Sequence, residues 1–588
     1  MKKIINDPKH IVSDMCSGII FADNRLSLNS KYKLILKKRM DKSKVTLISG
    51  GGSGHEPAHA GFIGKGLLDA AVCGDVFASP TQIQVYQAIR GTAGDKGTLL
   101  IIKNYSGDMM NFKNALHMAQ EDGLSVDYVK VDDDVAVNDS LYTVGRRGVA
   151  GTVFVHKIVG AAAEQGLSLP EVKRVAEKVI SNVKSIGIAL TSCTVPAKGS
   201  PTFELGEMEM EYGVGIHGEP GIRREKIVSA RELAGRMLVS LCDELKFEAD
   251  KGTRAAILIN GFGATPLMEL YVLNKEVIRE LYEKGVTVTR SFVGNFMTSI
   301  DMAGASVSIL RLDDELEAFL NAPCESLALN ISGAEDDIEY RDFFTEGQKD
   351  AEYCFTVETP DSFGIIGDEL TLENMIYIVD VMSDSIIKNE VLFCEMDSYA
   401  GDGDFGMSVA KGFRQLKREW KTIIAQSKNI GSFLDACSLV LMEHCGGASG
   451  PIWGSAFRSA GKFAGERTSL KVADFAALLQ SAVMGIQSTG KRSFGRGAVV
   501  GDKTLIDALA PCADAWRICA ANAEGFTQAF RAGASAATEG AEKTKNIVAR
   551  MGRAGAVGER SLGYPDAGAY GLGVVFTDIT DALQTSIS

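Results

Sequence analysis

Residues 45–57 read VTLISGGGSGHEP, a short β-branched run that passes almost directly into four glycines within five positions. Such a run predicts a buried strand, and glycines after it let the backbone approach a ligand closely and present amides to an oxygen. Ligands of open α/β sheets usually bind at the carboxyl ends of strands. A tight turn that needs positive φ is the alternative explanation, but a turn requires fewer glycines and no histidine. The stretch therefore predicts an α/β domain with a ligand site in this loop.

Further short apolar runs alternate with helical stretches through the first half of the chain, which is the rhythm of a layered α/β domain. Besides the run at 45–48, the expected strands are residues 70–73, 99–102, 126–131, 186–190, 255–259, 286–288 and 307–310. Several of them run straight into glycine-rich or acidic loops. A division near residues 182–186 gives two α/β subdomains, about 1–184 and 185–335, within a domain that spans residues 1–335.

The pattern changes after about residue 332. Residues 336–368 form an acidic, weakly periodic stretch that we expect to be a linker. Beyond it the composition shifts to Ala, Met, Ser and Gly, and apolar residues follow helical spacing at Met375, Ile376, Val379 and Met382. Residues 369–588 are therefore predicted to form an all-α domain. A chain of 588 residues is too long for one hydrophobic core, so a multidomain protein is expected.

Charge and composition argue against several classes of protein. The net charge of −13 argues against a nucleic-acid binder, because nucleic acids demand a basic surface. No run of eighteen uncharged apolar residues occurs, which argues against a membrane span, and Asp7 and Pro8 interrupt the N-terminus before a signal peptide could develop. The eleven cysteines include no Cys-x-x-Cys pair, so we expect free thiols in a reducing cytosol and a cytoplasmic protein.

His55-Glu56-Pro57-Ala58-His59 also matches the His-Glu-x-x-His pattern of zinc proteases. That metal site needs both histidines one turn apart in a formed helix, and Pro57 cannot occupy a helix interior. The motif also follows a glycine loop and has no obvious third ligand. We therefore discount a zinc site here.

Two further loops in the first half carry reactive side chains. Lys103 and Asp108 flank a loop after the predicted strand at 99–102, where a carboxylate can deprotonate a substrate hydroxyl and a lysine can hold an oxygen. The alternative is an ordinary Ser-Gly-Asp loop. His217, one of seven histidines, stands among glycines at the end of an apolar run, where a core residue would have bulky neighbours. A neutral imidazole with room around it is a nucleophile, so His217 is a candidate catalytic residue.

Residues 395–406 read EMDSYAGDGDFG. The glycines satisfy the Gly-x-Gly-x-x-Gly spacing of dinucleotide-binding loops, but no strand precedes them and the aspartates would repel a pyrophosphate. An EF-hand fails because the third acidic position and the terminal glutamate are absent. Asp397, Asp402 and Asp404 suit Mg²⁺, which takes carboxylates together with substrate phosphates. The alternative is a solvated acidic turn.

Two more glycine loops lie in the second half. Residues 446–451 (GGASGP) could give amides to a phosphate at a helix start. Residues 497–504 (GAVVGDKT) nearly imitate a P-loop, but Asp502 interrupts the Gly-Lys dipeptide and the spacing is one residue short. A P-loop also needs a preceding strand, so we reject a P-loop enzyme.

Together these segments resemble the dihydroxyacetone kinase family over nearly the whole chain and in the same order. The matching segments are residues 50–57, 103–108, 215–221 and, as support, 295–304 (NFMTSIDMAG), then 397–406, 446–450, 501–507 (GDKTLID) and 552–566 (GRAGAVGERSLGYPD). The first half is similar to the family's substrate-binding domain and the second half to its nucleotide-binding domain. The resemblance implies an ATP-using enzyme, a nucleotide domain built as a barrel of helices, and a homodimer formed through the substrate domain.

The resemblance also implies a role for each motif. His217 is expected to hold a ketose as a covalent hemiaminal, and Asp108 to act as general base with help from His55. The expected substrate-binding residues are Gly52, Ser53, Lys103, Asp108 and His217. The expected ligands of two Mg²⁺ ions that bridge the phosphates of ATP are Asp397, Asp402 and Asp404. The expected nucleotide contacts are Gly406, Ser408, Gly446, Gly447, Ala448, Ser449, Gly450, Gly501, Asp502, Lys503, Thr504, Gly552, Arg553 and Asp566.

Several functions stay open at this point. The leading one is phosphorylation of dihydroxyacetone, with erythrulose or glyceraldehyde as alternative substrates; glycerol has no carbonyl for His217 to capture. A different class is a metal-dependent lyase that cleaves FAD to cyclic FMN, which would need the nucleotide domain but not His217. A third is a non-catalytic regulator that binds a ketose, against which the three aspartates argue. Ala448, where the family frequently has threonine, Phe405 and the segment 552–556 depart from the family pattern on the nucleotide side.

Overall fold

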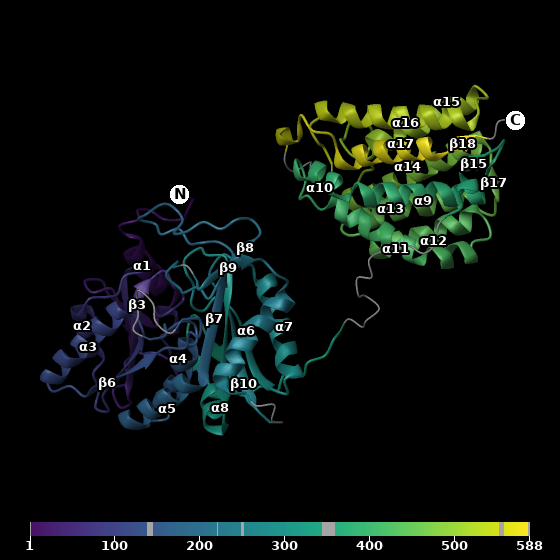
Figure 1. Cartoon of the computed structure of the whole chain (residues 1–588). Helices are drawn as coiled ribbons and strands as arrows, with labels where there is room; N and C mark the ends of the chain where they lie inside the picture. The colour runs from purple at the N-terminus through teal and green to yellow at the C-terminus, as the bar shows by residue number, and fades with distance from the viewer. Residues whose placement is uncertain are drawn as a thin grey trace. The chain divides into compact units, whose positions relative to one another are not determined.

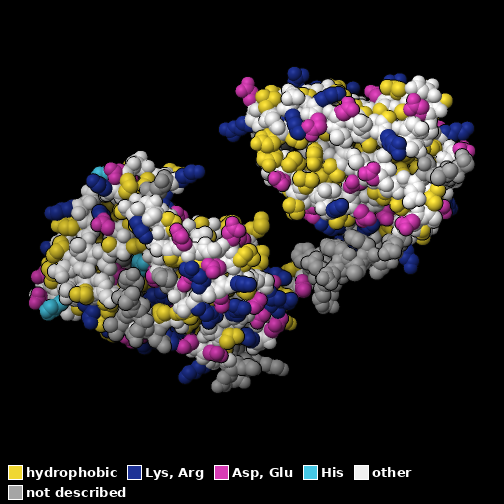
Figure 2. Space-filling view, turned by 45° about the horizontal axis from the view of Figure 1, so that its top comes forward, with side chains coloured by type: hydrophobic (Ala, Val, Ile, Leu, Met, Phe, Trp, Pro, Cys, Tyr) yellow, Lys and Arg dark blue, Asp and Glu magenta, His cyan; other side chains and the backbone are white. Residues whose placement is uncertain are grey.

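The computed structural model describes residues 2–137, 145–219, 221–247, 252–343, 359–551 and 558–585. It divides into two compact units, Met1–Thr345 and Glu346–Ser588 (Figure 1). The first is an α/β unit and the second is mostly helical. Acidic and basic side chains are interspersed over the visible face of each unit, the pattern of an ordinary solvated surface (Figure 2).

The first sheet of the α/β unit has the strand order β1-β2-β4-β3-β5-β6. The strands are β1 (Leu26–Asn29), β2 (Leu34–Lys37), β3 (Thr46–Ser53), β4 (Ala70–Val76), β5 (Thr98–Lys103) and β6 (Val126–Val131). The last four are mutually parallel, whereas β1 and β2 form an antiparallel edge. Parallel strands are buried on both faces, which explains why β3 and β5 consist of buried residues throughout.

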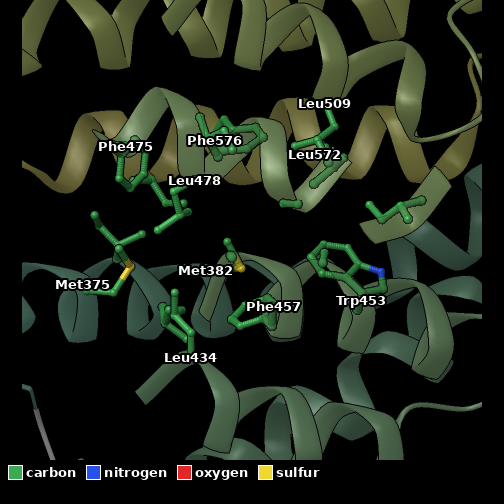
Figure 3. A pocket seen from close by; sticks show the side chains of 18 of the residues that line it. Met375, Met382, Leu434, Trp453, Phe457, Phe475, Leu478, Leu509, Leu572 and Phe576 are labelled. Carbon is green, nitrogen blue, oxygen red and sulfur yellow. The ribbon is translucent and has the colours of Figure 1, made fainter. Parts of the chain in front are cut away.

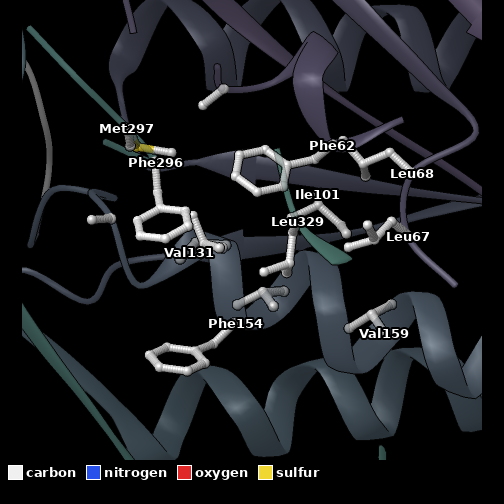
Figure 4. Packing of buried hydrophobic residues seen from close by; sticks show 14 of the residues in the cluster. Phe62, Leu67, Leu68, Ile101, Val131, Phe154, Val159, Phe296, Met297 and Leu329 are labelled. Atoms are coloured by element: carbon white, nitrogen blue, oxygen red, sulfur yellow. The ribbon is translucent and has the colours of Figure 1, made fainter. Parts of the chain in front are cut away.

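Helices cover both faces of this sheet. The helices are α1 (Ile11–Ala22), α2 (Gln82–Thr92), α3 (Ser106–Glu121), α4 (Thr152–Glu164) and α5 (Leu169–Asn182). On one face Leu100 and Ile102 of β5 share a core with Ile89 of α2 and Phe112 of α3. On the other face Ile101 belongs to the same cluster as Phe154 of α4 (Figure 4).

The second sheet has the order β11-β10-β12-β7-β8-β9. Its strands are β7 (Val183–Ala189), β8 (Glu209–Tyr212), β9 (Arg223–Lys226), β10 (Arg254–Gly261), β11 (Thr287–Gly294) and β12 (Gly304–Leu312). Residues of α6 (Ala230–Leu245) and α7 (Leu267–Glu283) pack on one face. Leu258 and Leu310 from the other face belong to the same core as Ile101 of the first sheet. The two sheets therefore share one core. All eight predicted strands are confirmed.

The stretch that follows the α/β unit differs from the expected linker at both ends. Ile338 pairs with Val288 of β11, and Arg290 donates to Glu335 Oε1 at 2.8 Å, so the first linker residues are tied to the second sheet. At the other end β15 (Ile365–Ile366) pairs with β18 (Gln584–Thr585) and belongs to the helical unit. The predicted linker of 336–368 is therefore too long at both ends; its residues 344–358 lie outside the described residues.

The helices of the second unit pack in a closed ring. They are α9 (Leu372–Lys388), α10 (Glu390–Ser398), α11 (Phe405–Gln426), α12 (Ile430–His444), α13 (Ser449–Ala464), α14 (Val472–Phe494), α15 (Ile506–Ala521), α16 (Phe526–Lys543) and α17 (Ala567–Ala582). From α11 to α17 each helix packs on the next, and α9 contacts both α17 and α11 and closes the ring. Two pairs of two-residue strands, β15–β18 and β16 (Leu370–Thr371) with β17 (Ser469–Leu470), correct the all-α prediction to mostly helical.

The interior of this ring is lined by apolar side chains. Met375, Leu434, Phe457, Phe475 and Leu572 surround a cavity between the helices (Figure 3). Bulky and flexible side chains of this kind fill a ring too wide for a simple bundle core. Among the described residues, none of the helices is long and apolar enough to cross a membrane.

Candidate active site

The predicted substrate residues lie where neighbouring strands of the first sheet end. β3 ends at Ser53, two residues before His55, and β5 ends at Lys103. Because β3 and β5 are adjacent and parallel, their carboxyl ends meet at the same edge of the sheet. Asp108 lies in the first turn of α3, which follows β5 after two residues. The topology therefore brings together two motifs that lie fifty residues apart in the sequence.

Glycines allow this loop to pass close to the two charged groups. A Cβ added at Gly51 would lie 3.2 Å from Lys103 Nζ and 3.5 Å from Asp108 Oδ2. A Cβ at Gly52 would lie within 2.8 Å of the backbone of Phe77. A side chain at Gly51 would therefore fill the space beside the ammonium and the carboxylate, and one at Gly52 would collide with the neighbouring backbone.

Two polar atoms at this place have no partner in the described chain. Lys103 Nζ and Asp108 Oδ1 are both buried and make no hydrogen bond. Buried polar groups are almost always paired, so unpaired ones indicate a site completed by a ligand. A small polyhydroxylated ligand offers hydroxyls as both donors and acceptors. The Ser53 hydroxyl, by contrast, donates to Gly74 O at 2.7 Å and is fixed within the protein.

His217 lies between β8 and β9 and is held by a buried charged network. Its backbone N–H donates to Glu219 Oε2 at 2.8 Å, and Glu219 Oε1 accepts from Arg147 Nη1 at 3.3 Å. Arg147 also donates to Asp134 Oδ2 at 2.7 Å and to Gly213 O at 2.8 Å. Arg147 and Asp134 are almost inaccessible to solvent. The network fixes the backbone on both sides of the histidine.

The structure joins His217 to the glycine loop through His55. The Nε2 atoms of the two rings lie 3.2 Å apart, and His55 Nδ1 lies 2.8 Å from Thr298 O. A carbonyl oxygen only accepts, so His55 carries its hydrogen on Nδ1, and its neutral Nε2 accepts from His217. No hydrogen bond joins His55 to Asp108 in the described chain. His55 thus faces the imidazole that is expected to attack, and its expected help to Asp108 stays a prediction.

Aromatic rings border His217 on two further sides. Its ring lies edge-to-face with Tyr105, at 4.5 Å between centroids, and with Phe77, at 5.3 Å. Edge-to-face packing restricts rotation of the imidazole. Phe77 follows β4 at the same edge of the sheet that carries the glycine loop. The ring is thus held in one orientation before any substrate binds.

Burial shifts the pKa values of these groups toward their neutral forms. The pKa of His217 is lowered well below its usual value by burial, and then by the charges of Lys103 and Arg147. The pKa of His55 is lowered by burial, Lys103 and His217. Burial raises the pKa of Asp108, although Lys103 and a hydrogen bond from Ser79 partly offset this effect. A neutral imidazole and a carboxylate of increased basicity are the states that a nucleophile and a general base require.

In the helical unit the predicted nucleotide loops gather at one end of the ring. Successive helices of an up-and-down ring alternate in direction, so alternate helices begin at the same end. The N-termini of α11, α13, α15 and α17 accordingly all line one pocket. The pocket residues from these ends include Phe405, Ser408, Gly446, Gly447, Ala448, Ser449, Lys503, Thr504, Leu505, Asp566, Ala567 and Gly568.

These helix ends favour anions. The first N–H groups of a helix have no intrahelical partner, and the helix dipole places partial positive charge there. Three of the four helices, α11, α13 and α15, have no side-chain cap. Some of their first amides already have partners, since Met407 N donates to Cys394 Sγ and Ile506 N to Thr504 Oγ1, both at 3.3 Å, whereas Asp566 caps α17 by accepting from Ala569 N at 2.8 Å.

The predicted metal ligands converge at the same pocket. One carboxylate oxygen from each of Asp397, Asp402 and Asp404 lies within 4.8 Å of the others. Asp397 Oδ2 accepts from the N–H groups of Gly403 and Asp404 at 2.9 and 3.1 Å, which folds the loop around it. Burial, with a contribution from Asp402, raises the pKa of Asp397. Oxygen ligands clustered in this way fit Mg²⁺, which would relieve their repulsion.

Asp566 adds a fourth carboxyl to this pocket. Burial raises its pKa to about 7, and the charges of Asp507 and Asp397 contribute in the same direction. Asp507 is itself buried and accepts from Gly501 N at 2.6 Å and Thr504 N at 2.8 Å. It therefore fixes the loop that the sequence compared with a P-loop.

The Lys503 side chain does not match its predicted role as a nucleotide contact. Its ammonium donates to the backbone carbonyls of Thr544 at 2.9 Å and Tyr564 at 2.8 Å, and also to Ser561 O. A lysine has three N–H donors, so none is left for a phosphate. Lys503 lines the pocket, and its ammonium holds segments of the pocket wall together. The Asp502 carboxylate likewise accepts from Arg496 Nη2 and Val499 N, both at 3.0 Å. Gly552 and Arg553 lie outside the described residues.

Several residues at the sites escaped the sequence interpretation. Thr298 belongs to the supporting segment 295–304, and its N–H donates to His55 O at 3.1 Å. Glu219 was quoted only as a neighbour of His217, and Arg147 and Phe77 were not singled out. No local pattern marks them, because each reaches the site through a contact between distant segments.

Comparison with known proteins identifies two known domains in the chain. Residues 17–328 match the Dak1 domain and residues 399–581 match the DAK2 domain. The chain is 51% identical over 315 residues, 53% of its length and 94% of the relative, to the dihydroxyacetone-binding subunit DhaK of a PTS-dependent dihydroxyacetone kinase from Lactococcus lactis. It is 33% identical to D-erythrulose kinase of Mycolicibacterium smegmatis over 100% of this chain and 99% of that one. It is 32% identical to the triokinase/FMN cyclase of Rattus norvegicus over 99% of both chains.

A solved structure shows the same fold. The dihydroxyacetone kinase from C. freundii in complex with AMP-PNP and Mg²⁺ aligns with a TM-score of 0.59 at 30% identity, covering 99% of both chains. An α/β unit with a strand-end site, followed by a helical unit with a carboxylate site, defines a kinase that acts on small ketoses or trioses. The chain belongs to the dihydroxyacetone kinase family.

Proposed function

We propose that this protein transfers the terminal phosphoryl group of ATP to dihydroxyacetone, which it holds covalently on His217. The observation that carries this proposal is the neutral His217 in one site with two buried polar atoms that have no partner in the described chain, Lys103 Nζ and Asp108 Oδ1. The identity of 51% to a dihydroxyacetone-binding subunit supports the three-carbon ketose over erythrulose, because that relative aligns with the α/β unit that carries the site.

In the proposed reaction a ring nitrogen of His217 adds to the ketone carbon, and the carbonyl π bond breaks so that its electrons move to the oxygen. The hydrogen of His217 Nε2 passes by way of His55 Nε2, which faces it at 3.2 Å, to this oxygen, which becomes the hydroxyl of the hemiaminal. Lys103 Nζ donates a hydrogen bond to a substrate oxygen. Asp108 removes the proton from the terminal hydroxyl as this oxygen attacks the phosphoryl group. Addition to the carbonyl selects ketoses, because glycerol offers no electrophilic carbon.

On the nucleotide side we propose that the starts of α11, α13 and α15, which carry the positive ends of the helix dipoles, attract the phosphates of ATP. Asp397, Asp402 and Asp404 would hold two Mg²⁺ ions, which supply neutralising charge to the phosphates when bound. Asp397 is positioned for this by two backbone amides that keep its carboxylate in the loop.

The test is ADP release by the purified protein with Mg-ATP, comparing dihydroxyacetone, both erythrulose enantiomers, glyceraldehyde and glycerol. We expect turnover with ketoses, the highest kcat/KM with dihydroxyacetone, and none with glycerol. His217→Ala should lower ketose turnover by more than about a hundredfold, because covalent holding supplies the orientation of the reacting hydroxyl. Equal turnover of glycerol would contradict capture at His217.

A second activity is favoured by the relative named triokinase/FMN cyclase, which aligns along 99% of this chain. We propose that the helical unit can also cleave FAD to cyclic FMN, since that reaction needs the metal carboxylates but not a ketose. His217→Ala separates the two activities. The variant should lose kinase activity and keep FAD cleavage, whereas Asp402→Asn should lose both. Loss of FAD cleavage in His217→Ala would exclude an activity confined to the helical unit.

A further inference from the structure

Two exposed tyrosines stack face to face at the rim of the nucleotide pocket. The rings of Tyr399 and Tyr564 lie 4.0 Å apart between centroids at an interplanar angle of 9°. Tyr399 directly follows α10, and Tyr564 lies in the segment before α17. Their side chains are 39% and 43% exposed, so most of the ring surface outside the shared face meets solvent. The contact joins two loops that are 165 residues apart.

The two loops form different walls of the pocket. Ala400 and Gly401 line it on the side of Tyr399, and Pro565 and Asp566 line it on the side of Tyr564. Each tyrosine is two residues from a carboxylate of the pocket, Asp397 or Asp566. A stack at this place sets the separation of these walls.

Both tyrosines are anchored from behind. The Tyr399 hydroxyl donates to Glu395 Oε1 at 3.3 Å, one helical turn earlier. The Tyr564 carbonyl accepts from Lys503 Nζ at 2.8 Å, and the preceding Gly563 N–H donates to Lys545 O at 2.9 Å. The ring positions are therefore prepared by the surrounding chain. Lys503 contributes to this arrangement, because its hydrogen bond holds the segment that carries Tyr564.

The walls have two reasons to separate when no ligand is bound. Asp397 and Asp402 on one side and Asp566 on the other carry carboxyl groups, and like charges repel. The loop also contains Gly401 and Gly403, and Gly403 has a φ of +76°, so its open state has high conformational entropy. The attraction between the stacked rings of Tyr399 and Tyr564 opposes both effects, and the rings do not occupy the pocket.

We propose that Tyr399 and Tyr564 form an aromatic latch that holds this side of the pocket closed and slows the departure of a magnesium–nucleoside triphosphate complex. The inference rests on the proposed nucleotide site. The latch acts through the position of the loops, so both tyrosines are positioning residues. Opening the latch reduces the fraction of binding-competent pocket and weakens apparent affinity by the same factor.

The experiment measures dissociation of a fluorescent N-methylanthraniloyl-ATP with Mg²⁺ by stopped flow, together with KM for ATP and kcat. The variants are Tyr399→Ala, Tyr564→Ala, the double variant, and Tyr399→Phe as matched control. Each alanine variant should raise the dissociation rate and KM about two- to tenfold, the range for an aromatic pair, with kcat at saturating ATP within about twofold. The double variant should equal the single ones, because either change removes the same contact. Tyr399→Phe keeps the stacked ring and should restore most of the slow dissociation.

Three results would overturn the latch. Dissociation rates unchanged in both alanine variants show that the stack does not hold the pocket, and so do additive effects in the double variant. A Tyr399→Phe variant as fast as Tyr399→Ala assigns the effect to the hydroxyl instead. Wild-type protein that fails to bind the magnesium–nucleotide overturns the proposed function together with the latch. If the wild-type protein binds the magnesium–nucleotide and the variants release it at the wild-type rate, the latch alone is overturned.

Discussion

Replacing Lys503 with methionine tests whether its ammonium stabilises the pocket wall through hydrogen bonds or binds a phosphate. Methionine keeps the length and apolar stem of the side chain but donates no hydrogen bond. The ammonium is bonded to the carbonyls of Thr544, Ser561 and Tyr564, and Lys503 is 1% exposed. Thr544 and Ser561 are fully buried, whereas Tyr564 is 43% exposed.

The expected cost follows mainly from the buried Ser561 carbonyl, because the Thr544 carbonyl keeps the N–H of Ile547 at 3.1 Å as a donor. A buried acceptor left without a partner costs about 1–3 kcal/mol, and a lost hydrogen bond at an acceptor that keeps another costs about 1 kcal/mol. Removing a buried ammonium also saves part of its desolvation penalty, whose effect is visible in the lowered pKa of Lys503. We therefore expect Lys503→Met to lower the free energy of unfolding of the helical unit by about 2 kcal/mol. For a domain of this size that corresponds to a Tm lower by about 4–8 °C.

The assay is differential scanning calorimetry of the whole chain, with the transition of the α/β unit as internal reference and KM for ATP measured beside it. Lys462→Met is the matched control, because Lys462 is exposed on α13 and should change stability by less than about 0.5 kcal/mol. KM for ATP should rise by no more than about tenfold, because the loss of the Lys503 bond weakens the stacking of Tyr564 on Tyr399. If Tm is unchanged and kcat/KM for ATP falls by more than about a hundredfold, the structural role of the Lys503 ammonium is refuted. Such a result would indicate that the ammonium binds a phosphate.

Three further predictions concern the reacting groups. The loss of kcat/KM for dihydroxyacetone at low pH is assigned to protonation of Asp108. Because the pKa of Asp108 is raised, this loss should begin at pH values above about 4. Asp108→Asn should remove this pH dependence together with most of kcat. Glu219→Gln should lower kcat about tenfold, because it weakens the link from Arg147 to the His217 backbone; wild-type kcat would contradict this link. Asp397→Asn should weaken Mn²⁺ binding about tenfold or more, measured by calorimetry without nucleotide, and unchanged binding would remove Asp397 from the metal site.

The interior strands of the α/β unit were predictable because burial on both faces demands continuous apolar runs. Strands β3 and β5 carry such runs and were found. The edge strands β1, β2, β8 and β9 were not predicted. Each has only four residues, and β9 reads Arg-Arg-Glu-Lys, a sequence that no hydrophobic pattern distinguishes from a loop. Their pairing depends on a neighbouring strand that the local sequence does not reveal.

The site was predictable to the extent that glycine and charge are unusual at strand and helix ends. The glycine loop, Lys103, Asp108 and the three metal aspartates all stand at such ends. The sequence could not assign the direction of a side chain. His55 Nε2 faces His217, and the Lys503 ammonium bonds to backbone carbonyls although the residue lines the pocket. Both outcomes depend on segments hundreds or tens of residues away, so they belong to the tertiary structure alone.

The two sites need opposite protonation states, and burial acts on both. A nucleophilic imidazole must stay neutral, and burial beside Lys103 and Arg147 makes protonation of His217 unfavourable. Metal carboxylates must stay charged, and the two backbone N–H groups that donate to Asp397 favour its anion and partly offset the burial that raises its pKa. Acidification should therefore affect the sites by different routes. At the ketose site it protonates the general base Asp108, whose pKa is raised by burial, whereas at the nucleotide site it competes with the metal for the carboxylates, and excess Mg²⁺ should reverse only the second loss.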